Sequence, residues 1–223
     1  VCECGKIHRS SVKEVFGGSG AIGRLPEAIA KLGGTKAFIL ADENTFGAAG
    51  DRVTAALESA RIPYSKYVLK NGCMPDEKTI GSSFTHFDNS CDVIVGVGSG
   101  VINDTSKLVS KVSRRPYISV ATAPSMDGYA SVTSSMDIDG LKTSLKTKCA
   151  EIIIGDTDVL KNAPMRMLRA GLGDMLAKYV SICEWRISHL VTGEYYCERI
   201  ASLIREALRK CADNAEGLIN RDE

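Results

Sequence analysis

Asp174 is the residue whose surroundings most clearly suggest chemistry. It follows Gly171 and Gly173 inside an otherwise apolar helical pattern that runs from Arg169 to Tyr179. Each glycine costs a helix roughly 1 kcal/mol relative to alanine, so two beside an acid indicate that a ligand or another backbone comes close. Asp174 is therefore a candidate functional carboxylate. The alternative interpretation is a notch for helix packing.

Two glycine-rich loops could hold a nucleotide phosphate. The stretch Gly18-Ser19-Gly20-Ala21-Ile22-Gly23 matches G-x-G-x-x-G, follows an expected strand, opens an expected helix and precedes Asp42 by about the usual spacing. The stretch Gly96-Val97-Gly98-Ser99-Gly100 offers the same physics, because its glycines let amides approach an anion and a helix follows it. The pattern by itself favours Gly18–Gly23.

The elements that must position these loops alternate between short β-branched runs and amphipathic segments. This alternation predicts a parallel sheet with crossover helices. The expected strands cover residues 12–16, 37–41, 64–69, 93–97 and 117–121, and the expected helices cover residues 21–32, 47–60, 76–87 and 102–112. Asp139-Gly140 is a hairpin signal, and a strand at residues 151–154 would close the domain.

After Pro164 the sequence changes to helical periodicity, with one apolar stripe from Leu168 to Cys183 and another from Ile200 to Cys211. The fold class is therefore α/β. We expect a Rossmann-like parallel-sheet nucleotide-binding domain at residues 1–162 and the start of an all-helical domain at residues 163–223. Two helices do not complete a helical domain, so this second region is expected to be truncated.

Composition favours a small-molecule partner. The 223 residues are 44% hydrophobic and 25% charged with a formal net charge of +1, which provides no global field for nucleic acid or an anionic membrane. Apolar runs stop at strand length, so no membrane segment is expected. Eight cysteines without C-x-x-C spacing predict a reduced, cytoplasmic protein.

Cys2, Cys4 and His8 form a separate group of possible metal ligands near the start of the chain. A closed structural zinc site needs four ligands, and the nearby sequence supplies only these three. The alternative interpretation is a frayed N-terminal strand with incidental thiols.

Three blocks in order carry a family resemblance: residues 96–104 after the apolar run 92–95, residues 122–131 after 117–121, and residues 169–179. Together they resemble sn-glycerol-1-phosphate dehydrogenases, within the superfamily of metal-dependent polyol dehydrogenases and dehydroquinate synthases. The resemblance implies an oxidoreductase of phospholipid biosynthesis that interconverts glycerol 1-phosphate and dihydroxyacetone phosphate with NAD or NADP. It also implies a divalent metal (zinc, nickel or iron) and a homo-oligomer.

The same resemblance assigns roles to individual residues. It places the pyrophosphate on the second glycine loop and makes Gly18–Gly23 a tight turn. From its position at a strand end, and not from the resemblance, Asp42 is expected to bind the adenine ribose and to favour NAD over NADP. The remaining expected cofactor contacts are Gly98, Ser99, Gly100, Val101, Ile102, Thr122, Ser125 and Ser131.

By the resemblance, Asp174 and Asp127 are catalytic and bind substrate, and Asp174 also ligates the metal. The alternative for Asp127 is a turn aspartate before glycine. The family supplies two histidine ligands from its helical domain, whereas this chain has only His8, His86 and His189. The chain is therefore expected to lack part of its metal site. A glycerol dehydrogenase, or a non-catalytic nucleotide-binding fragment, is the alternative function.

Overall fold

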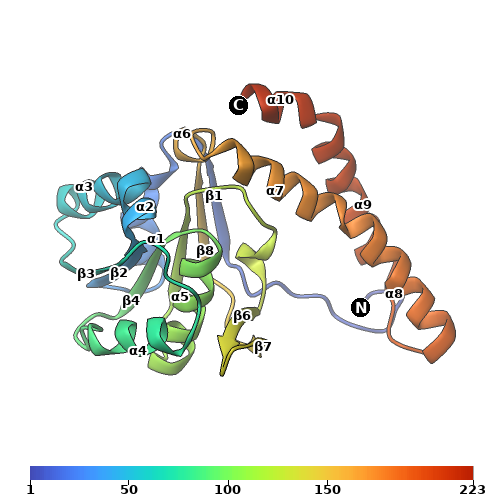
Figure 1. The fold of residues 1–223 in the computed structure, drawn as a ribbon, viewed down its shortest axis with the longest axis horizontal. Helices are drawn as coiled ribbons and strands as arrows, with labels where there is room; N and C mark the ends of the chain where they lie inside the picture. Colours follow the sequence, from blue (N-terminus) through green and yellow to red (C-terminus); the bar gives the residue numbers. More distant parts are fainter. Residues whose placement is uncertain (223) are drawn as a thin grey trace. The chain divides into compact units, whose positions relative to one another are not determined.

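The computed structural model describes residues 1–222, which divide into two compact units (Figure 1). The α/β unit comprises Ser11–Pro124 and Gly128–Ala163, and the helical unit comprises Val1–Ser10, Ser125–Asp127 and Pro164–Glu223. This grouping places residues 1–10 and 125–127 with the helices, whereas the sequence prediction assigned them to the α/β domain. The predicted domain boundary between residues 162 and 163 stays a prediction.

The α/β unit is built on a six-stranded sheet in the order β1-β8-β5-β4-β2-β3, and every strand pair in it is parallel. The strands are β1 (Glu14–Gly18), β2 (Ala37–Asp42), β3 (Tyr64–Leu69), β4 (Val93–Gly98), β5 (Tyr117–Ala121) and β8 (Ile152–Asp156). The predicted α/β fold class is confirmed, and β3 and β5 have the predicted bounds.

Helices lie on both faces of this sheet (Figure 1). The helical segments are η1 (Ala21–Arg24), α1 (Leu25–Lys31), α2 (Glu43–Thr45), η2 (Phe46–Gly50), α3 (Asp51–Ser59), α4 (Glu77–Thr85), α5 (Gly100–Ser113), η3 (Gly128–Ala130) and α6 (Thr157–Leu160). Strand β2 shows why two covered faces are needed. Ile39 packs with α1 and α3 residues on one face, while Phe38 and Leu40 pack with Ile102 of α5 on the other. Period-two alternation of apolar side chains thus builds both halves of the core.

A hairpin lies between β5 and β8 in the chain, formed by β6 (Thr133–Ile138) and β7 (Leu141–Lys146) in antiparallel pairing. Its two-residue turn is the predicted Asp139-Gly140, with φ angles of 51° and 76°. Both angles are positive, as a type I′ turn requires.

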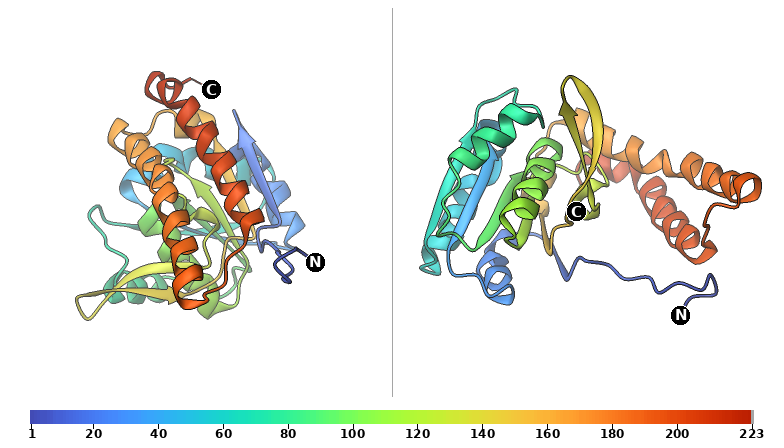
Figure 2. Two further views of the ribbon diagram at one scale, coloured as in Figure 1. Left: turned by 90° about the vertical axis from the view of Figure 1, so that its right-hand side faces the viewer. Right: turned by 90° about the horizontal axis from the view of Figure 1, so that it is seen from below.

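The helical unit contains α7 (Met165–Leu176), α8 (Lys178–Thr192), α9 (Glu198–Asp213) and α10 (Ala215–Asn220). Helix α9 packs back along α7 and α8 (Figure 2). Its buried core is small, with Ile182, Ala201 and Leu208 at the centre. Among the described residues, no helix combines the length and apolar composition that a membrane crossing requires.

Candidate functional site

The sheet order places one expected nucleotide site at the point where the strand connections change direction. From β2 the chain continues outward to β3, and it then returns to β4 on the other side of β2. Ala41 of β2 is in register with Val97 of β4, so Asp42 and Gly98 end neighbouring strands at the same edge. In open α/β sheets ligands bind outside the carboxyl ends of the strands at such a switch point.

Helix α5 starts directly after β4 and presents its amino end at this edge. Ser99 is its N-cap residue and makes no side-chain cap hydrogen bond, so the first-turn amides are not capped by that hydroxyl. A Cβ on Gly98 would lie 2.4 Å from Cβ of Ile102, whose side chain is buried in the core. Gly98 therefore lets α5 approach β4, and Ile102 can reach a ligand only through its backbone. The backbone amides at the start of this 14-residue helix favour the binding of an anion.

The competing loop Gly18–Gly23 lies at the end of the edge strand β1, and two of its donors have carboxylate acceptors. The Ile22 amide donates to Oδ2 of Asp156 at 3.0 Å, and the Ser19 hydroxyl donates to Oδ2 of Asp158 at 2.8 Å. The hydrogen bond from Ser19 lowers the pKa of Asp158, so this carboxylate is charged at neutral pH. Two carboxylates occupy the place of an anion and would repel a phosphate.

Asp42 has a structural role in addition to its predicted one. Its Oδ1 accepts a hydrogen bond from the Thr45 amide at 2.9 Å, and the Thr45 hydroxyl accepts from the Asp42 amide at 3.0 Å. This reciprocal pair is a capping box at the start of α2. Within the described residues the other carboxylate oxygen, Oδ2, makes no hydrogen bond, so the cap leaves it available to a ribose.

Two residues that the sequence reasoning missed hold the segment after β5. The Tyr129 hydroxyl donates to the Ala123 carbonyl at 2.7 Å, and burial raises the pKa of Tyr129. The buried Lys107 ammonium donates to the carbonyls of Gly128 at 2.8 Å and Thr133 at 3.1 Å. A lysine within the polar face of an expected helix gives no sequence signal for this role.

The four remaining expected cofactor contacts differ in their surroundings. Thr122 is buried, and its amide donates to the Gly98 carbonyl at 3.3 Å, which joins it to the α5 loop. The Ser131 hydroxyl lies 2.9 Å from the Thr133 hydroxyl and accepts the Thr133 amide, so it has a local structural partner. Val101 and Ser125 are half-buried. Cofactor roles for these residues stay predictions.

In the helical unit the two predicted catalytic carboxylates come together around a lysine that was not predicted. The Asp127 amide donates to Oδ2 of Asp174 at 2.7 Å. Lys178 Nζ lies 2.7 Å from Oδ2 of Asp127 and 4.0 Å from Oδ1 of Asp174. The hydrogen bond to Asp127 raises the pKa of Lys178. The spacing of four residues from Asp174 was the available signal, since it places Lys178 on the same helical face.

The described residues do not form a catalytic divalent-metal site around Asp174. No group of three possible ligands within residues 1–222 includes it. His189 lies fifteen residues further along the α7–α8 path, roughly 22 Å at helical rise, and its Nδ1 lies 2.6 Å from the Glu194 carbonyl oxygen. One carboxylate beside an ammonium group does not meet the usual requirement for three protein ligands. The role of Asp174 as a metal ligand stays a prediction.

Sequence comparison identifies the family. Residues 17–164 match the family described as iron-containing alcohol dehydrogenase. The chain is 33% identical over 220 residues to a protein of Halalkalibacterium halodurans named glycerol-1-phosphate dehydrogenase, NAD(P)+. That alignment covers 96% of this chain and 55% of the relative, so the chain spans about half the length of the curated relatives it matches.

Solved structures agree in fold. Glycerol dehydrogenase from Schizosaccharomyces pombe superposes with a TM-score of 0.68 at 26% identity, covering 78% of this chain and 44% of that one. NADH-dependent butanol dehydrogenase A from Thermotoga maritima gives a TM-score of 0.75 at 17% identity, covering 98% of this chain and 59% of that one, which shows the fold alone. With its parallel sheet, its glycine loop at the switch point and its matched sequence, the chain belongs to the iron-containing alcohol dehydrogenase family.

Proposed function

We propose that this chain is the nucleotide-binding part and first helices of an NAD(P)-dependent sn-glycerol-1-phosphate dehydrogenase, which interconverts glycerol 1-phosphate and dihydroxyacetone phosphate. The observation that carries the proposal is the glycine loop Gly98–Gly100 at the switch point, beside Asp42. The name of the Halalkalibacterium relative supports the substrate class.

In this proposal the chain's own residues bind and orient the coenzyme. Amides at the start of α5 hold the pyrophosphate, and Asp42 accepts hydrogen bonds from ribose hydroxyls. When bound, the nicotinamide supplies hydride chemistry. Lys178 holds Asp127 and Asp174 in the helical unit, where either carboxylate can accept a hydrogen bond from a polyol hydroxyl. No step is assigned to a metal, because the described residues do not complete a site at Asp174.

Other features of the proposal follow from the same observations. All eight cysteines are free, which supports a reduced, cytoplasmic protein. Apolar side chains exposed on α8, among them Ile187, Leu190 and Val191, support a homo-oligomer. The second candidate is a glycerol dehydrogenase, favoured by the Schizosaccharomyces structure.

A matched pair of substitutions tests the coenzyme site. Val101→Asp adds a carboxylate to the first turn of α5, where it stabilises the helix but repels pyrophosphate. Ser19→Asp adds one to the competing loop. NADH binding, followed by fluorescence titration, should weaken at least about tenfold in Val101→Asp and stay nearly unchanged in Ser19→Asp. The reverse order would move the pyrophosphate to Gly18–Gly23. Absence of NADH binding by the unmodified chain would contradict the proposal itself.

A further inference from the structure

Four side chains with metal-binding atoms converge in the helical unit, away from the residues discussed above. They are Cys2, Cys4 and His8 of the irregular N-terminal segment and Cys197, which precedes α9. All four ligand atoms lie within 4.8 Å of one another. The sequence reasoning found three of these residues and lacked the fourth, because Cys197 is 189 residues beyond His8. We propose that these four residues form a structural zinc site of the Cys3His type.

The interatomic distances fit a tetrahedral ion. With Zn–S near 2.3 Å and Zn–N near 2.05 Å, tetrahedral geometry puts two sulfurs about 3.8 Å apart and a sulfur and nitrogen about 3.6 Å apart. Cys2 Sγ and Cys197 Sγ lie 3.7 Å apart. His8 Nε2 lies 3.3 Å from Cys4 Sγ and 3.4 Å from Cys197 Sγ. A disulfide between Cys2 and Cys197 would need its sulfurs about 2.05 Å apart.

The backbone around the ligands supports the same arrangement. Residues 2–6 form a tight turn, in which the Gly5 amide donates to the Cys2 carbonyl at 2.8 Å and the Cys2 amide donates to the Lys6 carbonyl at 2.9 Å. Gly5 has a φ of 80°, a value that glycine adopts without strain. This turn brings Cys2 and Cys4 to one side. Cys197 is the N-cap residue of the 16-residue helix α9, where the helix dipole favours a thiolate.

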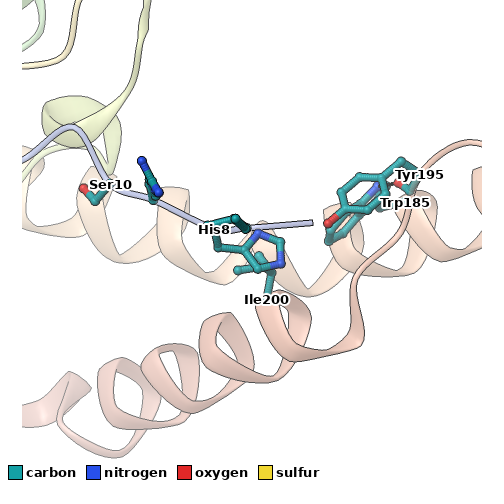
Figure 3. Close-up of a pocket in the computed structure, with 7 residues that line it drawn as sticks. His8, Ser10, Trp185, Tyr195 and Ile200 are labelled. Atoms are coloured by element: carbon teal, nitrogen blue, oxygen red, sulfur yellow. Dashed lines mark hydrogen bonds between the residues drawn. The ribbon is translucent and has the colours of Figure 1, made fainter. Parts of the chain in front are cut away.

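A second layer of contacts holds the ligands. Tyr195 Oη lies 3.1 Å from Cys4 Sγ, and the Trp185 ring nitrogen donates to the Tyr195 carbonyl at 2.5 Å. Lys6 Nζ lies 3.4 Å from the centre of the Tyr195 ring, a cation–π contact that helps to hold this ring. Figure 3 shows His8 beside Ile200, and Trp185 with Tyr195, in the depression that these residues line. Partners of this kind orient metal ligands.

The helical unit has a physical need for such a link. Its buried core is small, and the N-terminal segment that it includes has no regular secondary structure. Units with small cores are commonly stabilised by a metal or by disulfides. Zinc would fasten the N-terminal segment to the start of α9.

Metal analysis of the purified 223-residue chain tests the proposal. The chain is reduced, loaded with zinc chloride, desalted and analysed for bound zinc. We expect about one zinc per chain, and less than about a tenth of that in Cys197→Ser and in His8→Asn. Cys183→Ser is the matched control, because Cys183 is an exposed cysteine of α8 outside the cluster, and it should retain the zinc.

A thiol count gives an independent measurement. Three cysteines should be protected from a thiol reagent in the zinc-loaded chain and become reactive after a chelator is added. If the buried Cys197→Ser variant does not fold, the exposed His8→Asn variant decides the result. Zinc that is absent from the loaded chain, or equally bound by His8→Asn, overturns the proposal. If the chain holds no zinc after the loading step and instead contains a Cys2–Cys197 disulfide, the zinc proposal is overturned in favour of a redox-active cysteine pair. None of these outcomes depends on NADH binding.

Discussion

Removing the charge of Asp42 while keeping its helix cap should change coenzyme preference without destabilising the fold. Asp42→Asn leaves an oxygen that can accept from the Thr45 amide, and asparagine is as good an N-cap as aspartate. Asp42→Ala removes both the charge and the cap. The Asn variant therefore separates the proposed ribose contact from the structural role that the capping box reveals.

The expected change in coenzyme preference is the sum of the effects on NAD binding and on NADP binding. A hydrogen bond to a charged acceptor is worth about 1.5–3 kcal/mol and one to a neutral acceptor about 1 kcal/mol, so NAD should lose about 1 kcal/mol of binding free energy. Like charges near 4 Å in water repel by about 1 kcal/mol, so NADP should gain about that much. Together these changes raise the ratio of NADP to NAD affinity by about 2 kcal/mol, or roughly 30-fold.

Asp76 provides a matched control. It caps α4 through the same kind of bond, because its Oδ1 accepts from the Thr79 amide at 2.8 Å, but it does not end a strand at the switch point. Asp42→Ala and Asp76→Ala should each cost about 1 kcal/mol of unfolding free energy in urea titrations. Only substitution of Asp42 should change the affinity ratio, measured by fluorescence titration with NADH and NADPH. An unchanged ratio in Asp42→Asn would show that this carboxylate is structural alone.

Three further outcomes are expected. Asp92→Ala should cost about 1–2 kcal/mol in urea unfolding near pH 7, because the Asp92 carboxylate accepts the Thr35 amide and hydroxyl at 2.8 and 2.6 Å. Burial acts to raise the pKa of Asp92, but these hydrogen bonds outweigh it and lower the pKa. The cost of the substitution should therefore shrink as pH falls below about 4, and a cost independent of pH would contradict this. Lys107→Met should cost about 3 kcal/mol, measured in the same way, because it leaves the half-buried Asp104 without its cation 3.5 Å away and removes the donor to the Gly128 and Thr133 carbonyls; a cost below about 1 kcal/mol would mean that these contacts together contribute little. Chelation of zinc should lower the thermal midpoint of the unmodified chain but not that of His8→Asn, and equal midpoints with and without chelator would indicate no stabilising metal.

The regular elements of the sheet were predictable because each depends on local pattern. The short apolar run at residues 37–41 predicted β2, and Asp139-Gly140 predicted the hairpin turn. Helix starts were less accurate. The segment expected as one helix from residue 47 to 60 is three pieces starting at Glu43, because the Asp42 capping box begins a helix earlier than the apolar periodicity does.

The choice between glycine loops could not be made from pattern, since both satisfy the same local rules. Partners far along the chain distinguish them: Asp156 and Asp158 accept from two donors of Gly18–Gly23 from more than 130 residues away. Substitution of Gly98 itself is a poor test of this choice. A valine at Gly98 would collide with Ile102 and disturb folding, which is why an added charge is the better probe.

Contacts that span long stretches of sequence explain the other omissions. Lys178 is close in sequence to Asp174, but its partner Asp127 precedes it by 51 residues. Cys197 joins Cys2 across 195 residues. Sequence reasoning identified the residue types and missed the partners that only folding brings near.

The grouping of residues 1–10 with the chain after Pro164 has a topological consequence. The α/β unit is an insertion: all of it lies between two segments, ending at Ser10 and beginning at Pro164, that belong to the helical unit. The entropy cost of closing a loop grows only with the logarithm of its length. The long insertion therefore adds little to the cost of bringing the two helical-unit segments together. A single protease cut at the exposed turn Asp139-Gly140 would leave two fragments, each containing part of the helical unit. Their separation would require that unit to come apart, so a nicked chain should migrate as one particle until it is denatured.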